Sequence, residues 1–209
     1  MYGFDKKEVS VLKKLNSPRK IQDFLDRLKI NFEPGGDTCL SPRMVLKERK
    51  AHCIEGAMLA AVALRLNGHR PLVVDLASSF HDYDHVIAVY RQNGYWGAIS
   101  KVNHCGLRYR DPVYKTIREL VMSYFHEYTD RKGKKTLRSY SMPVDLSRFD
   151  KKGWMTSGKD VWFIPEYLLN VPHKQILSRS QISTLRKWDK FEMKVGSLEE
   201  WKSRASSGI

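Results

Sequence analysis

The chain has 209 residues, enough for one large domain or a core with an appendage, and a net charge of +14 from 37 Lys and Arg against 23 Asp and Glu. Its hydrophobic fraction of 42% is typical of a globular protein, which excludes a chain without a core. It contains no run of about 18 apolar residues, so we expect no membrane-spanning helix.

The cysteines and the N-terminus indicate the compartment. Cys39, Cys53 and Cys105 are odd in number and widely spaced, which is typical of a reducing environment rather than a disulfide framework. Residues 1–15 are charged and lack the apolar stretch of a signal peptide. We therefore expect an intracellular, cytoplasmic protein.

Two His-Cys dipeptides raise the question of a metal. His52-Cys53 and His104-Cys105 could combine with Cys39 in a zinc site. The close Cys-x-x-Cys spacing of structural zinc sites is absent, however. We expect neither a metal nor another cofactor.

The positive charge bears on partners. An excess of this size attracts nucleic acid, anionic lipid or acidic proteins over long range. The basic residues are spread along the chain, with one dense cluster at Arg131-Lys132-Gly133-Lys134-Lys135. No nucleic-acid motif accompanies the charge, so we favour an acidic partner over nucleic acid, which the charge alone leaves open.

The N-terminal part predicts three helices. Residues 5–15 carry apolar side chains at helical spacing. Ser17-Pro18 and Ser41-Pro42 each place a serine N-cap before a proline, which predicts a helix start at both positions. The Pro-Gly-Gly sequence between them predicts a loop over 30–40.

The centre of the chain predicts a buried helix followed by a hairpin. The segment 53–67 is rich in Ala and Leu, which favour helix, and Gly68 is placed for a left-handed C-terminal cap. Strands are predicted at 71–76 and 85–92. Asn93-Gly94 is a strong two-residue hairpin signal that leads into a return strand over 95–102.

The remaining chain predicts one more strand and several helices. A short strand is expected to end at the Asp111-Pro112 turn, followed by an amphipathic helix over 116–128. Short helices are expected at 158–169, 180–188 and 197–204. The aromatic residues at 154–167 are predicted to lie in the core rather than to bind a substrate.

These elements predict an α+β fold. Residues 1–130 are expected to form a core with N-terminal helices, in which a central Cys-bearing helix packs on a small antiparallel sheet. Residues 131–209 are expected to form an aromatic-rich helical extension that packs on this core or covers its cleft.

Cys53 and His85 are the candidate chemical pair. A cysteine attacks as a thiolate, and an ordinary thiol is mostly protonated at neutral pH. The free amides and dipole of a first helical turn lower the pKa of a thiol, as does a nearby imidazolium. Cys53 opens the predicted helix, where its amide is also placed to help hold an oxyanion, and His85 opens a strand. Glu55 is interpreted as a surface or helix-start acid.

The hairpin register predicts which side chain orients His85. With a two-residue turn, Gln92 pairs with Tyr95, and counting back places Ile87 opposite Ser100. Ser100 then shares the face of His85 and lies diagonally next to it. We therefore expect Ser100 to orient His85.

Several residues occur in the order and spacing of a known superfamily. They are Ser41-Pro42-Arg43-Met44-Val45-Leu46, Cys53, Leu64-Arg65-Leu66-Asn67-Gly68, His85 and Trp96. In these residues the stretch 38–102, about a third of the chain, resembles the core of the transglutaminase-like superfamily, which shares the papain-like cysteine protease fold. The resemblance implies that Cys53 is a nucleophile, that His85 is its general base and acid, and that no cofactor is needed.

One position departs from the family pattern. The family has an Asp four residues after the tryptophan, where this chain has Ser100. Serine accepts a hydrogen bond from an imidazole but carries no charge to stabilise an imidazolium. Asp111 is the second candidate for this role, and Asp82 and Asp84 are the third.

Two functions from different classes follow. The first is a thiol enzyme, a peptidase, amidase or acyl transferase that acts on a protein or peptide amide through a thioester at Cys53. The second is an inactive relative that binds an acidic partner or nucleic acid through its basic surface. The identity of the residue that orients His85 distinguishes the two functions in the sequence. The reactivity of Cys53 distinguishes them by experiment.

Overall fold

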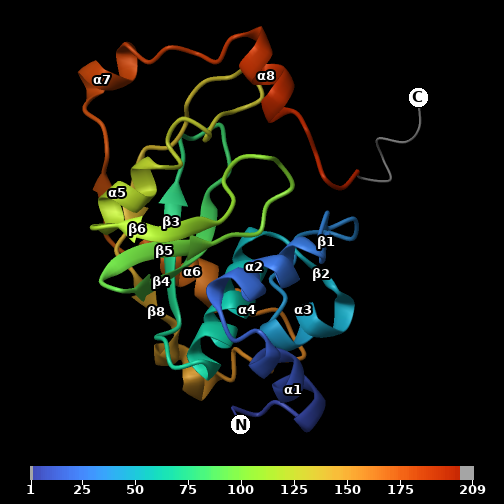
Figure 1. Cartoon of the computed structure of the whole chain (residues 1–209). Coiled ribbons are helices and arrows are strands. Elements are labelled where there is room, and N and C mark those ends of the chain that lie inside the picture. Colours follow the sequence, from blue (N-terminus) through green and yellow to red (C-terminus); the bar gives the residue numbers. More distant parts are fainter. Residues whose placement is uncertain (1, 203–209) are drawn as a thin grey trace.

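The chain is an α+β protein in the computed structural model, which describes residues 2–202 (Figure 1). Its helices are α1 (Lys6–Lys14), α2 (Pro18–Asp26), α3 (Pro42–Glu48), α4 (Cys53–Leu66), α5 (Ile117–Met122), α6 (Phe163–Asn170), α7 (Arg179–Ser183), α8 (Lys190–Gly196) and the 3-10 helix η1 (Leu146–Lys152). Its strands are β1 (Lys29–Ile30), β2 (Lys50–Ala51), β3 (Leu72–Ala77), β4 (His85–Gln92), β5 (Tyr95–Ile99), β6 (Arg110–Tyr114), β7 (Ser139–Ser141), β8 (Val144–Asp145) and β9 (His173–Gln175). None of the described helices combines the length and the apolar character that crossing a membrane requires.

Local sequence signals set the boundaries of the N-terminal helices. Ser17 and Ser41 cap α2 and α3, and each hydroxyl accepts a hydrogen bond from the amide three residues later, at 3.4 and 3.3 Å. After α4, Gly68 adopts a φ of +88°, a conformation that glycine enters without a steric penalty. These observations confirm the predicted helix starts and the predicted end of the central helix.

An antiparallel sheet of seven strands forms the centre of the described chain. Its main path is β6-β5-β4-β3-β7-β9, and β8 also pairs with β3. In the β4–β5 hairpin, Gln92 pairs with Tyr95 and Ala88 with Ile99, which confirms the predicted register. A second, parallel sheet consists of β1 and β2.

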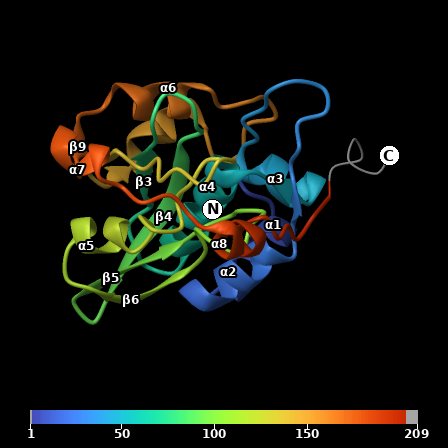
Figure 2. The same ribbon diagram turned by 90° about the horizontal axis from the view of Figure 1, so that it is seen from above.

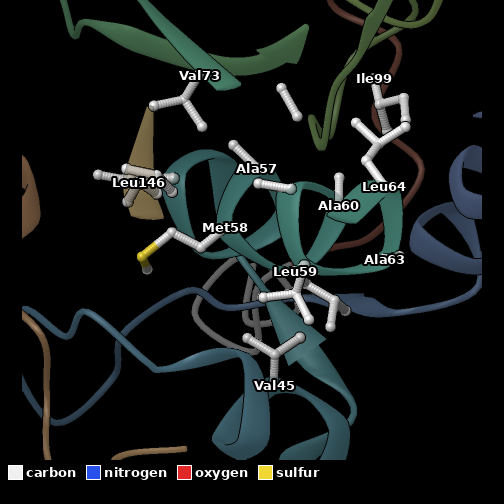
Figure 3. Close-up of a cluster of buried hydrophobic side chains, with 14 of the residues drawn as sticks. Val45, Ala57, Met58, Leu59, Ala60, Ala63, Leu64, Val73, Ile99 and Leu146 are labelled. Atoms are coloured by element: carbon white, nitrogen blue, oxygen red, sulfur yellow. The ribbon is translucent and has the colours of Figure 1, made fainter. Parts of the chain in front are cut away.

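The helix α4 packs against one face of the large sheet. Its residues from Ile54 to Leu64 are all buried, because small and aliphatic side chains let neighbours approach from every side. Figure 3 shows Val73 of β3 and Ile99 of β5 on one side of this helix and Val45 of α3 on the opposite side. The predicted central helix is therefore enclosed between the sheet and the N-terminal helices.

The opposite face of the sheet is covered by α5 and the turns that follow it. Leu120 and Tyr124 join a second hydrophobic cluster with the sheet residues Val74, Ile87 and Val89. Figures 1 and 2 show α4 and α5 on different sides of the strands. The sheet thus has a hydrophobic core on each face.

Two elements near residue 110 differ from the prediction. The segment Asp111-Pro112 lies inside β6 rather than in a turn after the strand. β6 is at the edge of the sheet, where a proline does not interrupt a ladder on both sides. The helix α5 is shorter than 116–128, because the Ser123 hydroxyl bonds to the Leu120 carbonyl and the chain continues as turns.

The C-terminal third also differs, because it adds strands as well as helices. β7 pairs with β3 on one side and with β9 on the other, so the sheet is larger than predicted. These strands have only two or three residues, too few to show an alternating pattern in the sequence. The third predicted C-terminal helix is displaced: Asp189 caps α8 by accepting from the amide of Phe191, and the described part of 197–204 is not helical.

Candidate active site

Cys53 is the first residue of α4. Its N-cap, His52, is extended, with φ −96° and ψ −170°, and the first amides of a helix have no partner within the helix. The Cys53 residue is partly exposed, whereas the residues that follow it are buried. The start of α4 therefore presents a thiol and free amides at the edge of the core.

His85 is anchored by Ser100, as the hairpin register predicts. The distance from His85 Nε2 to Ser100 Oγ is 2.7 Å, and both side chains are buried. The Ser100 hydroxyl donates its hydrogen to the Leu107 carbonyl oxygen at 2.6 Å, and it must therefore accept from His85. This network assigns the proton of a neutral His85 to Nε2 and leaves the lone pair on Nδ1.

The backbone of Ser100 is held by a side chain from α2. The Gln22 amide donates to the Ser100 carbonyl oxygen at 2.8 Å and accepts from the Ser100 amide at 2.9 Å. This pair imitates the hydrogen bonds of a neighbouring strand just beyond the end of β5. Gln22 therefore holds the backbone of Ser100, and the Ser100 hydroxyl orients the His85 ring.

Replacing Gln22 with alanine should lower the free energy of unfolding by about 2 kcal/mol. Two buried hydrogen bonds are lost, each worth about 1 kcal/mol, and their backbone partners stay buried. Urea unfolding followed by tryptophan fluorescence measures the change. Gln175→Ala, at an exposed position of β9, is the control and should cost less than about 0.5 kcal/mol. Equal effects of the two substitutions would contradict the assigned role of Gln22.

A close contact holds the segment after β5 against the first turn of α4. A Cβ atom added at Gly56 would lie 2.5 Å from Cβ of Lys101, so only glycine allows this approach. Lys101 is itself buried, and its Nζ donates to the Leu28 carbonyl oxygen at 2.6 Å. Because Lys101 follows Ser100, this contact sets the distance between α4 and the residue that orients His85.

Glu55 is an acid in the first turn of α4, as predicted, but it is fully buried and does not lie on the surface. Its carboxylate accepts from the amides of His52 and Leu40 at 2.9 and 2.8 Å and from the Thr38 hydroxyl at 3.1 Å. Asn31 Nδ2 lies 3.1 Å from the same carboxylate. The acid therefore ties the loop before α3 to the N-cap of α4 and fixes the residue that precedes the nucleophile candidate.

Two histidines act on the Cys53 thiol. Burial raises its pKa, but hydrogen bonds and charge from His52 and His85 lower it more, so the pKa of Cys53 falls to about 5. Burial lowers the pKa of His52, whereas Cys53, Glu55 and the Thr38 carbonyl raise it to about 9. These interactions favour the ionised form of the Cys53 thiol and the charged form of His52.

Comparisons with known proteins identify no family for this chain. No family model matches the chain. A search of curated proteins also returns no significant match.

The alternative carboxylates have hydrogen-bond partners or surroundings other than His85. Asp111 is exposed in β6, next to Arg110, which pairs with Ala98 on β5. Asp82 accepts a hydrogen bond from Thr136, and Asp84 accepts from the Ser78 amide at 2.7 Å. Within residues 2–202, none of these three carboxylates bonds to His85, so Ser100 is the side chain that holds it.

The other cysteines do not join the cluster through hydrogen bonds. Burial raises the pKa of Cys39 to about 12, with the charge of Glu55 adding to the effect. Cys105 is exposed, and its thiol donates to the Val195 carbonyl oxygen at 3.4 Å. In the part of the chain that the structure describes, no group of three or more His, Cys, Asp or Glu side chains is arranged to bind a metal ion.

A cavity of about 1390 Å³ lies beside the loop before β4 and the turn at Leu107, and neither Cys53 nor His85 lines it. Its walls include Tyr83, two residues before His85, and Leu107, whose carbonyl oxygen accepts the Ser100 hydroxyl. The exposed side chains of the predicted basic cluster form another part of the wall, and the C-terminal segment 188–199 forms a third. Figure 1 shows α8, which belongs to this segment, at the end of the molecule remote from α1.

The residues that sequence reasoning missed are those that support the pair. Gln22 and Gly56 carry no pattern that marks them, because their role depends on contacts between distant segments. Glu55 at the third position of α4 does carry a signal, since it reaches back to the amide of His52 as in a capping box. That signal identifies His52 as the N-cap and places its side chain next to Cys53.

Proposed function

We propose that the chain is a thiol enzyme of transglutaminase-like type that cleaves or transfers the acyl group of an amide. The observation that carries this proposal is the hydrogen-bonded series from the Leu107 carbonyl through Ser100 to His85, an imidazole that lowers the pKa of the Cys53 thiol. In this proposal Cys53 at the start of α4 is the nucleophile and His85 is the oriented base. A free amide of the first helical turn holds the oxyanion.

The proposed reaction has two stages. The Cys53 thiolate attacks the amide carbonyl carbon, the carbon–nitrogen bond breaks, and the leaving nitrogen takes a proton from an imidazole of the site. Water or an amine then attacks the thioester, gives its proton to His85, and releases Cys53. Hydrolysis and transfer differ only in this second nucleophile.

The pH dependence of Cys53 alkylation tests the proposal. Because the pKa of Cys53 is about 5, we expect half of the maximal rate near pH 5 and a plateau above it, whereas an ordinary thiol reaches half of its maximum near pH 8.5. Mass spectrometry of the labelled peptides resolves Cys53 from Cys39 and Cys105. The rate near neutral pH should fall in His85→Ala.

An activated ester extends this test from reactivity to catalysis. p-Nitrophenyl acetate should give a burst of nitrophenol and an acetyl group on Cys53, followed by slow turnover. Cys53→Ala should abolish the burst and Cys105→Ser should keep it. A Cys53 that titrates like an ordinary thiol and ignores His85 would contradict the proposal.

The basic wall of the cavity favours a second candidate function. Arg131, Lys132 and Lys134 are exposed there and form no salt bridge within residues 2–202. An inactive transglutaminase-like module could bind an acidic partner at this wall without chemistry at Cys53. An inert Cys53 together with salt-sensitive binding of an acidic peptide would support this candidate over the enzyme.

A further inference from the structure

The orientation of the His85 ring depends on an irregular segment between β5 and β6, residues 100–108, here called the supporting loop. Ser100 at its start lies 2.7 Å from His85 Nε2, and Leu107 near its end accepts the Ser100 hydroxyl at 2.6 Å. The residues between them belong to no helix and to no strand of either sheet. The position of the Leu107 carbonyl therefore depends on contacts made by other parts of the chain.

Leu107 has a backbone conformation that is uncommon for a residue with a side chain. Its φ is +57°, in the left-handed region. Its amide donates to Oε2 of Glu127 at 2.8 Å, and Nη2 of Arg110 donates to the same oxygen at 2.6 Å. The Tyr124 hydroxyl donates to the carbonyl oxygen of Arg108 at 3.0 Å. Such a conformation persists only where the surroundings hold it, so the loop is under constraint at the carbonyl that Ser100 uses.

The middle of the supporting loop is held by residues 186–201, here called the C-terminal strap. Nδ2 of Asn103 donates to the Trp201 carbonyl oxygen at 2.9 Å, and Oδ1 of Asn103 accepts from the Trp201 amide at 2.9 Å. The Asn103 carbonyl oxygen accepts from the Glu200 amide at 2.9 Å, and the Glu200 carboxylate accepts from Arg108 at 2.6 Å. The strap thus bonds to the residue on either side of the Leu107 turn.

Polar contacts rather than buried side chains attach the strap to the protein. None of its residues, all within the described chain, is buried. At its start, Trp188 Nε1 donates to the His126 carbonyl oxygen and the Trp188 amide to that of Gly133, both at 2.9 Å, and Nζ of Lys135 donates to the Arg186 carbonyl oxygen at 2.6 Å. Figure 1 shows the strap in red, running from α8 toward the point where the described residues end. A segment without buried side chains opens at a lower cost than the core, so the strap can separate while the sheet stays folded.

The Ser100 hydroxyl connects the strap to the protonation of the ring. Gln22 holds the Ser100 backbone from α2, so the carbonyl of Leu107 is the partner that moves when the supporting loop moves. A hydroxyl has one hydrogen to donate. While it donates to Leu107 it accepts from Nε2–H of His85; without Leu107 it can turn and donate to a lone pair on Nε2. The proton of the neutral ring then belongs on Nδ1.

We propose that the C-terminal strap determines the tautomer of His85 through the supporting loop, with Asn103 as a positioning residue. With the strap attached, Nε2 carries the ring proton and Nδ1 can accept one. When the strap separates, the Ser100 hydroxyl reverses, and the ring loses the proton on Nε2 to water and gains one on Nδ1. The catalytic consequence rests on the proposed function, because Nδ1 then no longer takes the proton of the nucleophile that attacks the thioester.

The test measures the ring nitrogen chemical shifts of His85 by NMR at about pH 9, where an ordinary imidazole is neutral. His85→Gln, which has no ring, identifies the signals. We expect the Nε2–H form to predominate in the wild type and the Nδ1–H form to predominate in Asn103→Ala. Asn170→Ala is the matched control, because Asn170 is an exposed asparagine whose amide also donates to a backbone carbonyl, that of Glu166, at 2.7 Å. It should leave the tautomer unchanged.

A second variant releases the strap without altering the supporting loop. Trp188→Ala removes the indole at the other point of attachment and should shift the tautomer in the same direction as Asn103→Ala. Hydrogen exchange should become faster at the Leu107 amide and in the strap in both variants, and should stay slow in α4. With p-nitrophenyl acetate, Asn103→Ala should keep the burst and slow the release of acetate from Cys53.

The possible results separate this inference from the proposed function. An unchanged tautomer in both variants, or unchanged exchange of the strap, would overturn the inference. A tautomer shift in Asn103→Ala alone would place the effect in the loop itself and overturn the role of the strap. A wild-type protein whose Cys53 takes no acetyl group would overturn the proposed function, and the NMR measurement would still decide whether the strap controls His85.

Discussion

Replacing Glu55 with alanine is expected to lower the free energy of unfolding by about 3–5 kcal/mol, a large part of the 5–15 kcal/mol typical of a folded domain. The carboxylate is fully buried and accepts from two backbone amides and from two side chains. Alanine leaves these donors inside the protein without an acceptor, and the cost of a buried unsatisfied group adds to the lost bonds. Urea unfolding monitored by tryptophan fluorescence gives the change.

Glu48→Ala is the control for this prediction. Glu48 is an exposed acid at the end of α3, and its removal should change stability by less than about 0.5 kcal/mol. If Glu55→Ala cost no more than Glu48→Ala, the loop before α3 would not depend on this carboxylate for its position.

Replacing Gly56 with alanine is expected to separate Ser100 from α4, to destabilise the fold and to suppress the reactivity of Cys53. The new Cβ would lie 2.5 Å from Cβ of Lys101, an atom near the backbone that cannot swing away as a side-chain tip can. Overpacking of this kind costs about 1–3 kcal/mol, which exceeds the gain of about 1 kcal/mol from the better helix propensity of alanine. The alkylation rate of Cys53 near neutral pH should fall with stability.

The matched control for Gly56 is Gly158→Ala. A Cβ atom at Gly158 meets nothing within 4 Å, and its φ is not in the left-handed region. This substitution should leave both unfolding and alkylation unchanged. An increase in stability in Gly56→Ala would show that Lys101 relaxes easily and that the contact does not set the geometry of the site.

The parts of the site that were predicted from the sequence are those governed by local rules. The Asn93-Gly94 turn determines the register of its hairpin, so the contact between His85 and Ser100 follows from counting residues. The start of α4 at Cys53 follows from a change in composition and from the spacing of its apolar residues.

The parts that were missed depend on distant contacts or on burial. An acid in the first turn of a helix normally lies in solvent, and only the tertiary structure shows that Glu55 is covered by the loop at Thr38 and Leu40. In the same way, the sequence of β7 shows no strand pattern. Its residues form a strand because they pair with the free edge of β3.

The pairing of β3 has a consequence for the synthesis of the chain. β3 lies beside β4 on one edge, but its other edge pairs with β7 and β8, which are made only at residues 139–145. On the ribosome this strand therefore carries a row of unpaired backbone groups after its first partner has been made. Until β7 and β8 are made, this edge can pair with a strand of another chain.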